Sequence, residues 1–201
     1  MAKSVNYTKS VGLPVARAHA VVTSEAYLLT VDETSDGSSS NLVVESGERT
    51  VEPDGTVNAA VVASQPASTS DDGASIPAMS VEQTTVVTPL VGGRFTVSSV
   101  TALPKGMGSM TLLLEYRGGQ DTTDGQDAVS DVASDAASDV ASDVASDVAS
   151  DAAAVTAVDA TVTAEVKIPL LGGKLAAKLL EKAEDSVDKA IRRVNRLSGE
   201  L

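Results

Sequence analysis

The sequence predicts an α+β protein in which an antiparallel sheet packs against a long C-terminal helix, and three observations carry that prediction. Residues 158–168 alternate apolar and polar side chains without exception, which is typical of a strand with one buried face. Residues 174–197 repeat apolar side chains every three or four positions, as a single buried helical stripe does. Between residues 41 and 116, Val- and Thr-rich segments alternate with short turns, which favours antiparallel neighbours.

The first thirty residues predict a strand followed by two short helices. Val5 and Tyr7 alternate with polar neighbours, the period-two pattern of a strand. Pro14 suits the first turn of a helix, where its missing N–H leaves no hydrogen bond unmade. Ser24 is a suitable N-cap for a second helix, because its side-chain oxygen can accept from a free backbone N–H.

The middle of the chain predicts five strands with short connections. Pro53-Asp54-Gly55 is expected to form a turn, because Pro presets φ and Gly adopts positive φ. The predicted strands are residues 41–51, 56–62, 81–88, 94–101 and 110–116, and the polar, Ser-rich residues 32–40 and 65–75 are expected as loops.

An acidic low-complexity segment interrupts this pattern. Nine Asp and no Lys or Arg lie between Asp121 and Asp151, so most of the net charge of −13 belongs to that stretch. An Asp-Val-Ala-Ser-like unit repeats every four residues, so an Asp stripe would drift by about 40° per unit around a helix. A frayed, exposed helix and disorder both remain open. We therefore expect one domain over residues 1–201, with residues 121–154 inserted in the hairpin before the last strand.

The turn between the last strand and the last helix carries a family resemblance. Residues 166–175, Val-Lys-Ile-Pro-Leu-Leu-Gly-Gly-Lys-Leu, resemble the signature of an uncharacterised actinobacterial domain family of unknown function in the START-like (SRPBCC) superfamily. That superfamily has the helix-grip fold. The resemblance implies a curved antiparallel sheet wrapped around the long C-terminal helix, with two short helices after the first strand.

The sequence lacks the residues that several kinds of functional site require. Cysteine is absent, which excludes disulfides and thiolate metal sites, and His19 is the single histidine, expected at the surface or edge. The Asp repeat lacks the alternating ligands, Gly and Glu of a calcium loop. Gly173-Lys174-Leu175 lacks the hydroxyl of a phosphate loop, and no Gly-x-Ser-x-Gly elbow occurs. We therefore predict no catalytic residues, no metal and no cofactor.

The same patterns limit the partners. A segment this acidic, in a chain with 2% aromatic residues, does not predict nucleic-acid binding. The basic residues of the last helix are interleaved with acidic ones, and Asp185–Lys189 and Asp188–Arg192 are expected as i,i+4 pairs. No apolar run approaches the roughly 18 residues of a spanning helix and the N-terminus does not resemble a signal peptide, so a soluble, cytoplasmic protein is expected. No pattern sets an oligomeric state.

The resemblance implies a module that binds a hydrophobic or amphipathic small molecule, such as a lipid or a polyketide-like compound, between sheet and helix. Tyr116 would then fix the ligand's orientation. The cavity is expected among Val97, Leu112, Leu114, Tyr116, Val162, Val166, Leu179, Ala183 and Val187.

Two alternatives stay open at this point. An enzyme of the aromatase or cyclase kind would need acid–base groups facing the same gap, where only Tyr7 and Tyr116 are suitable. A structural or interaction protein would instead have a filled core. The enclosed volume discriminates between these hypotheses, because ligand pockets usually measure roughly 300–1,000 Å³.

Overall fold

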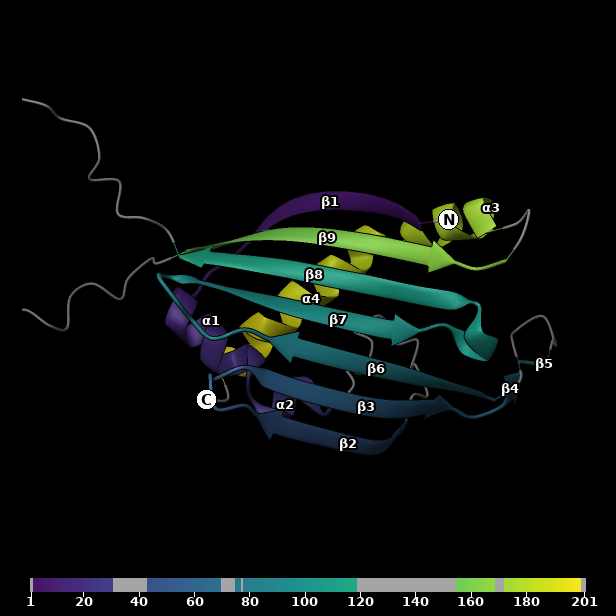
Figure 1. Cartoon of the computed structure of the whole chain (residues 1–201), viewed down its shortest axis with the longest axis horizontal. Helices are drawn as coiled ribbons and strands as arrows, with labels where there is room; N and C mark the ends of the chain where they lie inside the picture. The colour runs from purple at the N-terminus through teal and green to yellow at the C-terminus, as the bar shows by residue number, and fades with distance from the viewer. Residues whose placement is uncertain are drawn as a thin grey trace, which may run out of the picture.

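The computed structural model of the 201-residue chain describes residues 2–30, 43–69, 75–76, 78–118, 155–168 and 172–199. A curved sheet forms one layer and helices lie on its inner side (Figure 1). The elements in chain order are β1 (Ala2–Val11), α1 (Val15–Val22), α2 (Glu25–Leu28), β2 (Val43–Val51), β3 (Val57–Gln65), β4 (Ser68–Thr69), β5 (Ser75–Ile76), β6 (Met79–Val87), β7 (Arg94–Ala102), the 3₁₀ turn η1 (Pro104–Gly106), β8 (Gly108–Gly118), β9 (Thr156–Val166), α3 (Gly172–Leu180) and α4 (Ala183–Ser198).

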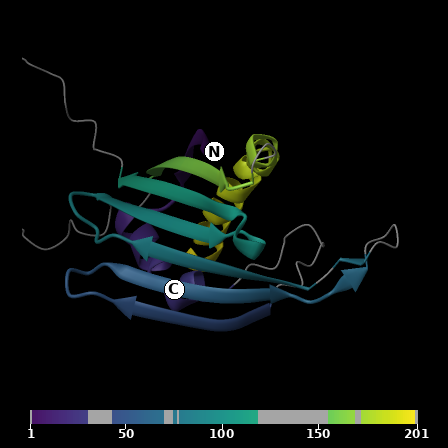
Figure 2. The same cartoon turned by 45° about the vertical axis from the view of Figure 1, so that its right-hand side comes forward.

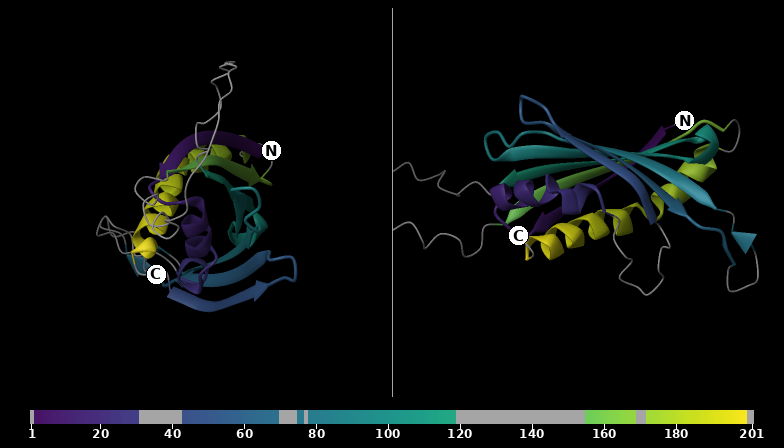
Figure 3. Two further views of the ribbon diagram at one scale, coloured as in Figure 1. Left: turned by 90° about the vertical axis from the view of Figure 1, so that its left-hand side faces the viewer. Right: turned by 90° about the horizontal axis from the view of Figure 1, so that it is seen from below.

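The main sheet has seven strands in the order β1-β9-β8-β7-β6-β3-β2, and every neighbouring pair is antiparallel. Strands adjacent in sequence pair as predicted, and the first strand closes against the last. The sheet curls around the helices, which share one side of it (Figure 3). This is the helix-grip α+β fold, and the predicted fold class is confirmed.

Strand β9 shows why the sheet has a buried inner face. Its inward residues Val158, Ala160, Val162, Ala164 and Val166 are at most 1% exposed, and the polar residues between them are not buried. Because these side chains are small, α3 can approach the strand closely. The alternation read from the sequence therefore defines the face on which the core is built.

The predicted opening of a strand and two helices is confirmed, and specific bonds anchor it. Helix α2 is capped by Ser24, whose Oγ accepts from the Tyr27 N–H at 3.2 Å. The loop before α1 is tied to the start of β9, because Thr156 Oγ1 donates to the Leu13 carbonyl at 2.6 Å. That bond explains how a fully buried threonine is tolerated in the core.

The long helix predicted over residues 174–197 differs in one respect, because a turn at Glu181 and Lys182 divides it into α3 and α4. Lys182 leaves the helical conformation with φ −101° and ψ 10°. The buried stripe continues through the break at Ala176, Leu180, Ala183 and Val187. The two segments thus bury one common face while the axis bends: α3 lies beside the end of β9, and α4 crosses the strands diagonally (Figures 1 and 2).

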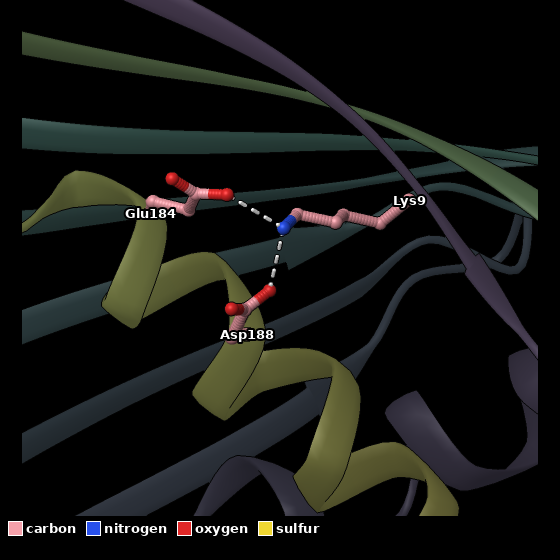
Figure 4. Close-up of polar contacts among 3 residues, drawn as sticks. All are labelled: Lys9, Glu184 and Asp188. Carbon is pink, nitrogen blue, oxygen red and sulfur yellow. Dashed lines mark hydrogen bonds and ion pairs between the residues drawn. The ribbon is translucent and has the colours of Figure 1, made fainter.

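Helix α4 is fastened to the first strand by a three-residue ion-pair cluster. Lys9 Nζ on β1 lies 2.9 Å from Glu184 Oε1 and 2.9 Å from Asp188 Oδ1 (Figure 4). These hydrogen bonds raise the pKa of Lys9 above its ordinary value, the bond to Asp188 contributing most. Asp188 thus contacts Lys9 rather than Arg192, the partner expected from the sequence.

Other expectations fall on parts of the chain that are only partly described. Residues 32–40, 121–154 and 169–171 lie outside the described residues, so the predicted loop, the acidic insert and the start of the Gly-Gly turn do as well. Residues 65–75, expected as a loop, contain β4 and the first residue of β5, which pair as two short antiparallel strands. None of the described helices has the length and apolar character needed to cross a membrane.

Candidate functional site

A pocket of about 510 Å³ lies between the inner face of the sheet and helices α2 and α4. Strands β3, β6, β7, β8 and β9 supply its floor. The residues lining it are Tyr27, Leu28, Thr30, Val61, Ala63, Val81, Gln83, Thr85, Ser99, Thr101, Met110, Leu112, Val162, Ser186, Lys189, Ala190 and Arg193. Its volume falls within the range usual for small-molecule sites.

The floor of the pocket is aliphatic on two sides. Val61 and Ala63 of β3 line one side, and Met110, Leu112 and Val162 of β8 and β9 line the other. The strand period of two aims these side chains inward, and none of them carries a polar oxygen or nitrogen. An apolar ligand surface placed against these residues would gain about 25 cal/mol of binding free energy for each Å² removed from water.

Between these two aliphatic groups, β6 and β7 supply the polar part of the floor. Gln83 pairs across the strands with Thr101, and Thr85 pairs with Ser99. Thr85 Oγ1 lies 3.0 Å from Ser99 Oγ, and Gln83 Nε2 donates to Thr85 Oγ1 at 3.3 Å. Thr85 is only 5% exposed, Ser99 and Thr101 are half-buried and Gln83 is exposed, so this polar ladder extends from the interior to solvent.

Arg193 holds the helical side of the pocket together. Its Nη2 donates to the carbonyls of Ala26 at 3.1 Å and Thr30 at 2.6 Å, and to Thr30 Oγ1 at 2.7 Å. The guanidinium carbon also lies 5.2 Å from the centroid of the Tyr27 ring, within cation–π range. The charge therefore pins the end of α2 to α4.

Lys189 lies one turn before Arg193 and is exposed, so it lines the pocket where the pocket meets solvent. Ser186, Lys189, Ala190 and Arg193 follow the i, i+3, i+4, i+7 spacing that places them on one helix face. Lys189 makes no ion pair with the described residues, and the expected pair with Asp185 is not formed.

The structure separates the nine predicted cavity residues. Leu112 and Val162 line the pocket. Leu179 is half-buried on α3 and lies outside it. The remaining six are packed in the core and do not line it: Val97, Leu114, Tyr116, Val166, Ala183 and Val187.

Aromatic rings fill the other end of the gap between sheet and helices. Phe95 and Tyr116 stack with centroids 4.4 Å apart and planes 8° apart, and His19 meets Phe95 edge-on at 4.9 Å. His19 is half-buried, and its Nε2 lies 3.2 Å from the Thr88 carbonyl oxygen. The pocket lies toward the other end of β7 and β8, where Ser99, Thr101 and Leu112 line it.

Tyr116 is therefore placed differently from the ligand anchor expected from the sequence. Its ring is fully buried, and its hydroxyl has no hydrogen-bond partner among the described residues. Burial raises the pKa of Tyr116 well above its usual value, with a smaller contribution from Tyr27. The hydroxyl thus stays protonated at neutral pH.

The pocket lining has a defined chemical character. Its described residues include Tyr27, Lys189 and Arg193 as titratable groups, and neither a carboxylate nor a histidine. Across the described part of the chain, no group of three or more His, Cys, Asp or Glu is arranged to hold a metal ion. The arrangement can enclose an apolar body and hydrogen-bond its polar atoms.

The polar ladder and Lys189 were not predicted as site residues. A signal for the ladder exists in the sequence: Gln83 and Thr85 share the parity of buried Val87, and Ser99 and Thr101 share that of buried Val97. Hydroxyls on the inward phase of two paired strands indicate a polar interior surface.

Comparison with known proteins shows likeness of fold. No family model and no curated protein matches the chain. The protein TTHA0849 from Thermus thermophilus is similar over 98% of this chain and 97% of its own, with 14% identity and a TM-score of 0.50. Ara h 8.0201 gives 8% identity and a TM-score of 0.47 over both whole chains. The di-domain ARO/CYC StfQ from the steffimycin biosynthetic pathway gives 14% and 0.46, and this chain spans about half of it, 52%.

Proposed function

We propose that this chain binds an elongated amphipathic small molecule in the pocket between sheet and helices, and that it acts as a binding module. The observation that carries the proposal is a pocket of about 510 Å³ in which polar residues of β6 and β7 lie between aliphatic residues of β3 and of β8 and β9. A core filled throughout, as the structural alternative requires, would leave no such space. The helix-grip fold supports membership in the START-like superfamily, and the residues at 166–175 support membership in its uncharacterised actinobacterial family. A cytoplasmic location is part of the same proposal.

Catalysis is the weaker alternative for this pocket. General acid–base chemistry needs a group whose pKa lies near the working pH and which reaches the reacting atom. The described lining supplies Lys189 at the opening, Arg193, which is engaged with the end of α2, and Tyr27, whose ring contacts Arg193. Tyr116 lies outside the lining.

Titration with the neutral fluorescent probe N-phenyl-1-naphthylamine tests the proposal. Ala63 lines the pocket, whereas Ala60 on the same strand is exposed on the outer face. We expect saturable binding at micromolar concentration, reduced at least about tenfold in Ala63→Phe because the ring fills the pocket, and unchanged in Ala60→Phe. Absence of binding to the folded protein, or equal loss in both variants, would overturn the proposal.

A second experiment seeks the ligand itself. Native mass spectrometry of the protein purified from its own host should show a bound mass that organic extraction releases. The Ala63→Phe variant, purified in the same way, should lack that mass.

A further inference from the structure

The charges around the pocket are one-sided. Its described lining contains two cations, Lys189 and Arg193, and no carboxylate, although the chain carries a net charge of −13. Arg193 is engaged with the carbonyls of Ala26 and Thr30 and with the Tyr27 ring. Lys189 makes no ion pair with the described residues, so its ammonium remains to meet a negative group at the opening.

The polar ladder of β6 and β7 also has unused hydrogen-bonding capacity. Thr85 and Ser99 each carry one O–H donor, and their mutual bond at 3.0 Å uses one of the two, whichever residue donates. Gln83 Nε2 donates to Thr85 Oγ1, so this bond uses an acceptor of the pair and neither of its O–H donors. One O–H donor of the Thr85–Ser99 pair is therefore unused. This donor lies on buried Thr85 or half-buried Ser99, and it favours a ligand oxygen because a hydrogen bond left unmade away from water is costly.

The register gives these groups a spacing along the ligand. Gln83–Thr101 and Thr85–Ser99 are successive pairs on one face of β6 and β7, so they are separated by about 7 Å along the strands. Aliphatic residues of β3 lie on one side of this ladder and those of β8 and β9 on the other. A matching ligand has aliphatic parts on both sides of an oxygen within its body.

We propose that the pocket selects an anionic amphiphile, a carboxylate with a hydroxyl or carbonyl oxygen partway along an aliphatic body. This inference rests on the proposed function. Lys189 binds the carboxylate at the opening, and the Thr85–Ser99 hydroxyl pair hydrogen-bonds the internal oxygen. Val61, Leu112 and Val162 contact the hydrocarbon.

Competition against N-phenyl-1-naphthylamine tests the inference with four matched ligands: hexadecanoic acid, a mid-chain hydroxyhexadecanoic acid, and the methyl ester of each. At low salt the free acids should bind roughly two- to fivefold more tightly than their esters, the size of one exposed ion pair. The hydroxyl should add roughly two- to tenfold, the size of one net hydrogen bond.

Two variants assign these preferences to residues. Lys189→Gln should abolish the acid-over-ester preference and keep the hydroxyl preference, and Lys178→Gln, an exposed lysine of α3 outside the pocket, should keep both. The double variant Thr85→Val with Ser99→Ala should abolish the hydroxyl preference alone. Thr84→Val, exposed on the outer face of the same strand, is its control.

The outcomes separate this inference from the proposed function. If the neutral probe binds and Ala63→Phe blocks it, but acids and esters bind equally or Lys178→Gln acts like Lys189→Gln, the anionic specificity is wrong and the binding module stands. Equal binding of hydroxylated and plain chains would overturn the role of the Thr85–Ser99 pair. If the probe does not bind, both proposals fall.

Discussion

The backbone of Gly108 lies directly against the carbonyl oxygen of Glu165 where β8 begins beside β9. Gly108 has φ +140° and pairs across the strands with Val166. A Cβ at this position would overlap the Glu165 carbonyl group, which is backbone and cannot rotate away. This close contact allows β8 to begin in register with β9 directly after the η1 turn.

Gly108→Ala should therefore lower the free energy of unfolding by at least about 2 kcal/mol, through backbone strain and steric overlap. Urea unfolding followed by circular dichroism measures the loss. Gly12→Ala is the control, because nothing lies within 4 Å of a Cβ there, and it should stay within about 0.5 kcal/mol of wild type. Equal stability of the two variants would mean that β8 shifts easily against β9.

Two leucines on β8 should respond differently to truncation. Leu114 is 0% exposed in the core, so Leu114→Ala should cost about 3–5 kcal/mol of unfolding free energy. Leu112 lines the pocket and already faces a void on one side, so Leu112→Ala should cost clearly less, about 1–2 kcal/mol. Denaturant midpoints at equal m-values make the comparison, and similar losses would indicate that the pocket closes in solution.

Local patterns were sufficient to predict the sheet. The alternation through Val158 and Val166 set the inner face, and Ser24 marked the start of α2. The break at Glu181 was not predictable from pattern, because it contains neither Gly nor Pro and the apolar stripe runs through it. Leu179 belongs to that stripe in the sequence, yet the bend leaves it half-buried.

The pocket was only partly predictable for a different reason. Periodicity indicates which face points inward, but not which part of that face is filled. Phe95, Tyr116 and His19 meet only in the folded structure, and their rings occupy the end where Val97 and Leu114 were expected to line a cavity.

The Lys9 cluster should make stability depend on alkaline pH. The pKa of Lys9 is raised from its ordinary 10.5, so its stabilisation is complete below that value and is lost as pH rises through the folded-state pKa. The gap in melting temperature between wild type and Lys9→Gln should be constant from about pH 7 to 9 and narrow as pH rises beyond about 10.5.

A control for this experiment lies on the same strand. Lys3 is exposed and forms no ion pair with the described residues, so Lys3→Gln should give no pH-dependent gap. A melting-temperature difference for Lys9→Gln that changes with neither pH nor added salt would show that Lys9 acts through packing alone.

Removing the Arg193 guanidinium should loosen α2. Arg193→Met keeps the aliphatic stem but loses the bonds to Ala26 and Thr30, so the amides of α2 and of Leu29 should exchange faster with solvent. We expect a loss of roughly 1–3 kcal/mol in unfolding free energy, the scale of hydrogen bonds to a charged group. Arg192→Met, at an exposed position, is the control; unchanged exchange in α2 would contradict the assigned role.

Replacing residues 121–154 with a short Gly/Ser turn should leave the melting temperature unchanged or slightly higher. Gly118 and Thr156 are cross-strand partners, so the two ends to be joined already lie side by side. Each doubling of loop length costs about 0.6 kcal/mol in closure entropy, which a shorter turn recovers. Scanning calorimetry checks this, and a large drop would show that the segment packs on the sheet.

The pairing of β1 with β9 has a consequence for biosynthesis. Val11 lies opposite Thr156, so β1 cannot pair with β9 until the residues between these strands have been synthesised. Until then the edge of β1 that pairs with β9 has no native partner. Contacts between residues so far apart in the sequence form slowly, on the scale of milliseconds to seconds. The nascent chain therefore exposes an unpaired edge of β1 to chaperones until β9 has left the ribosome.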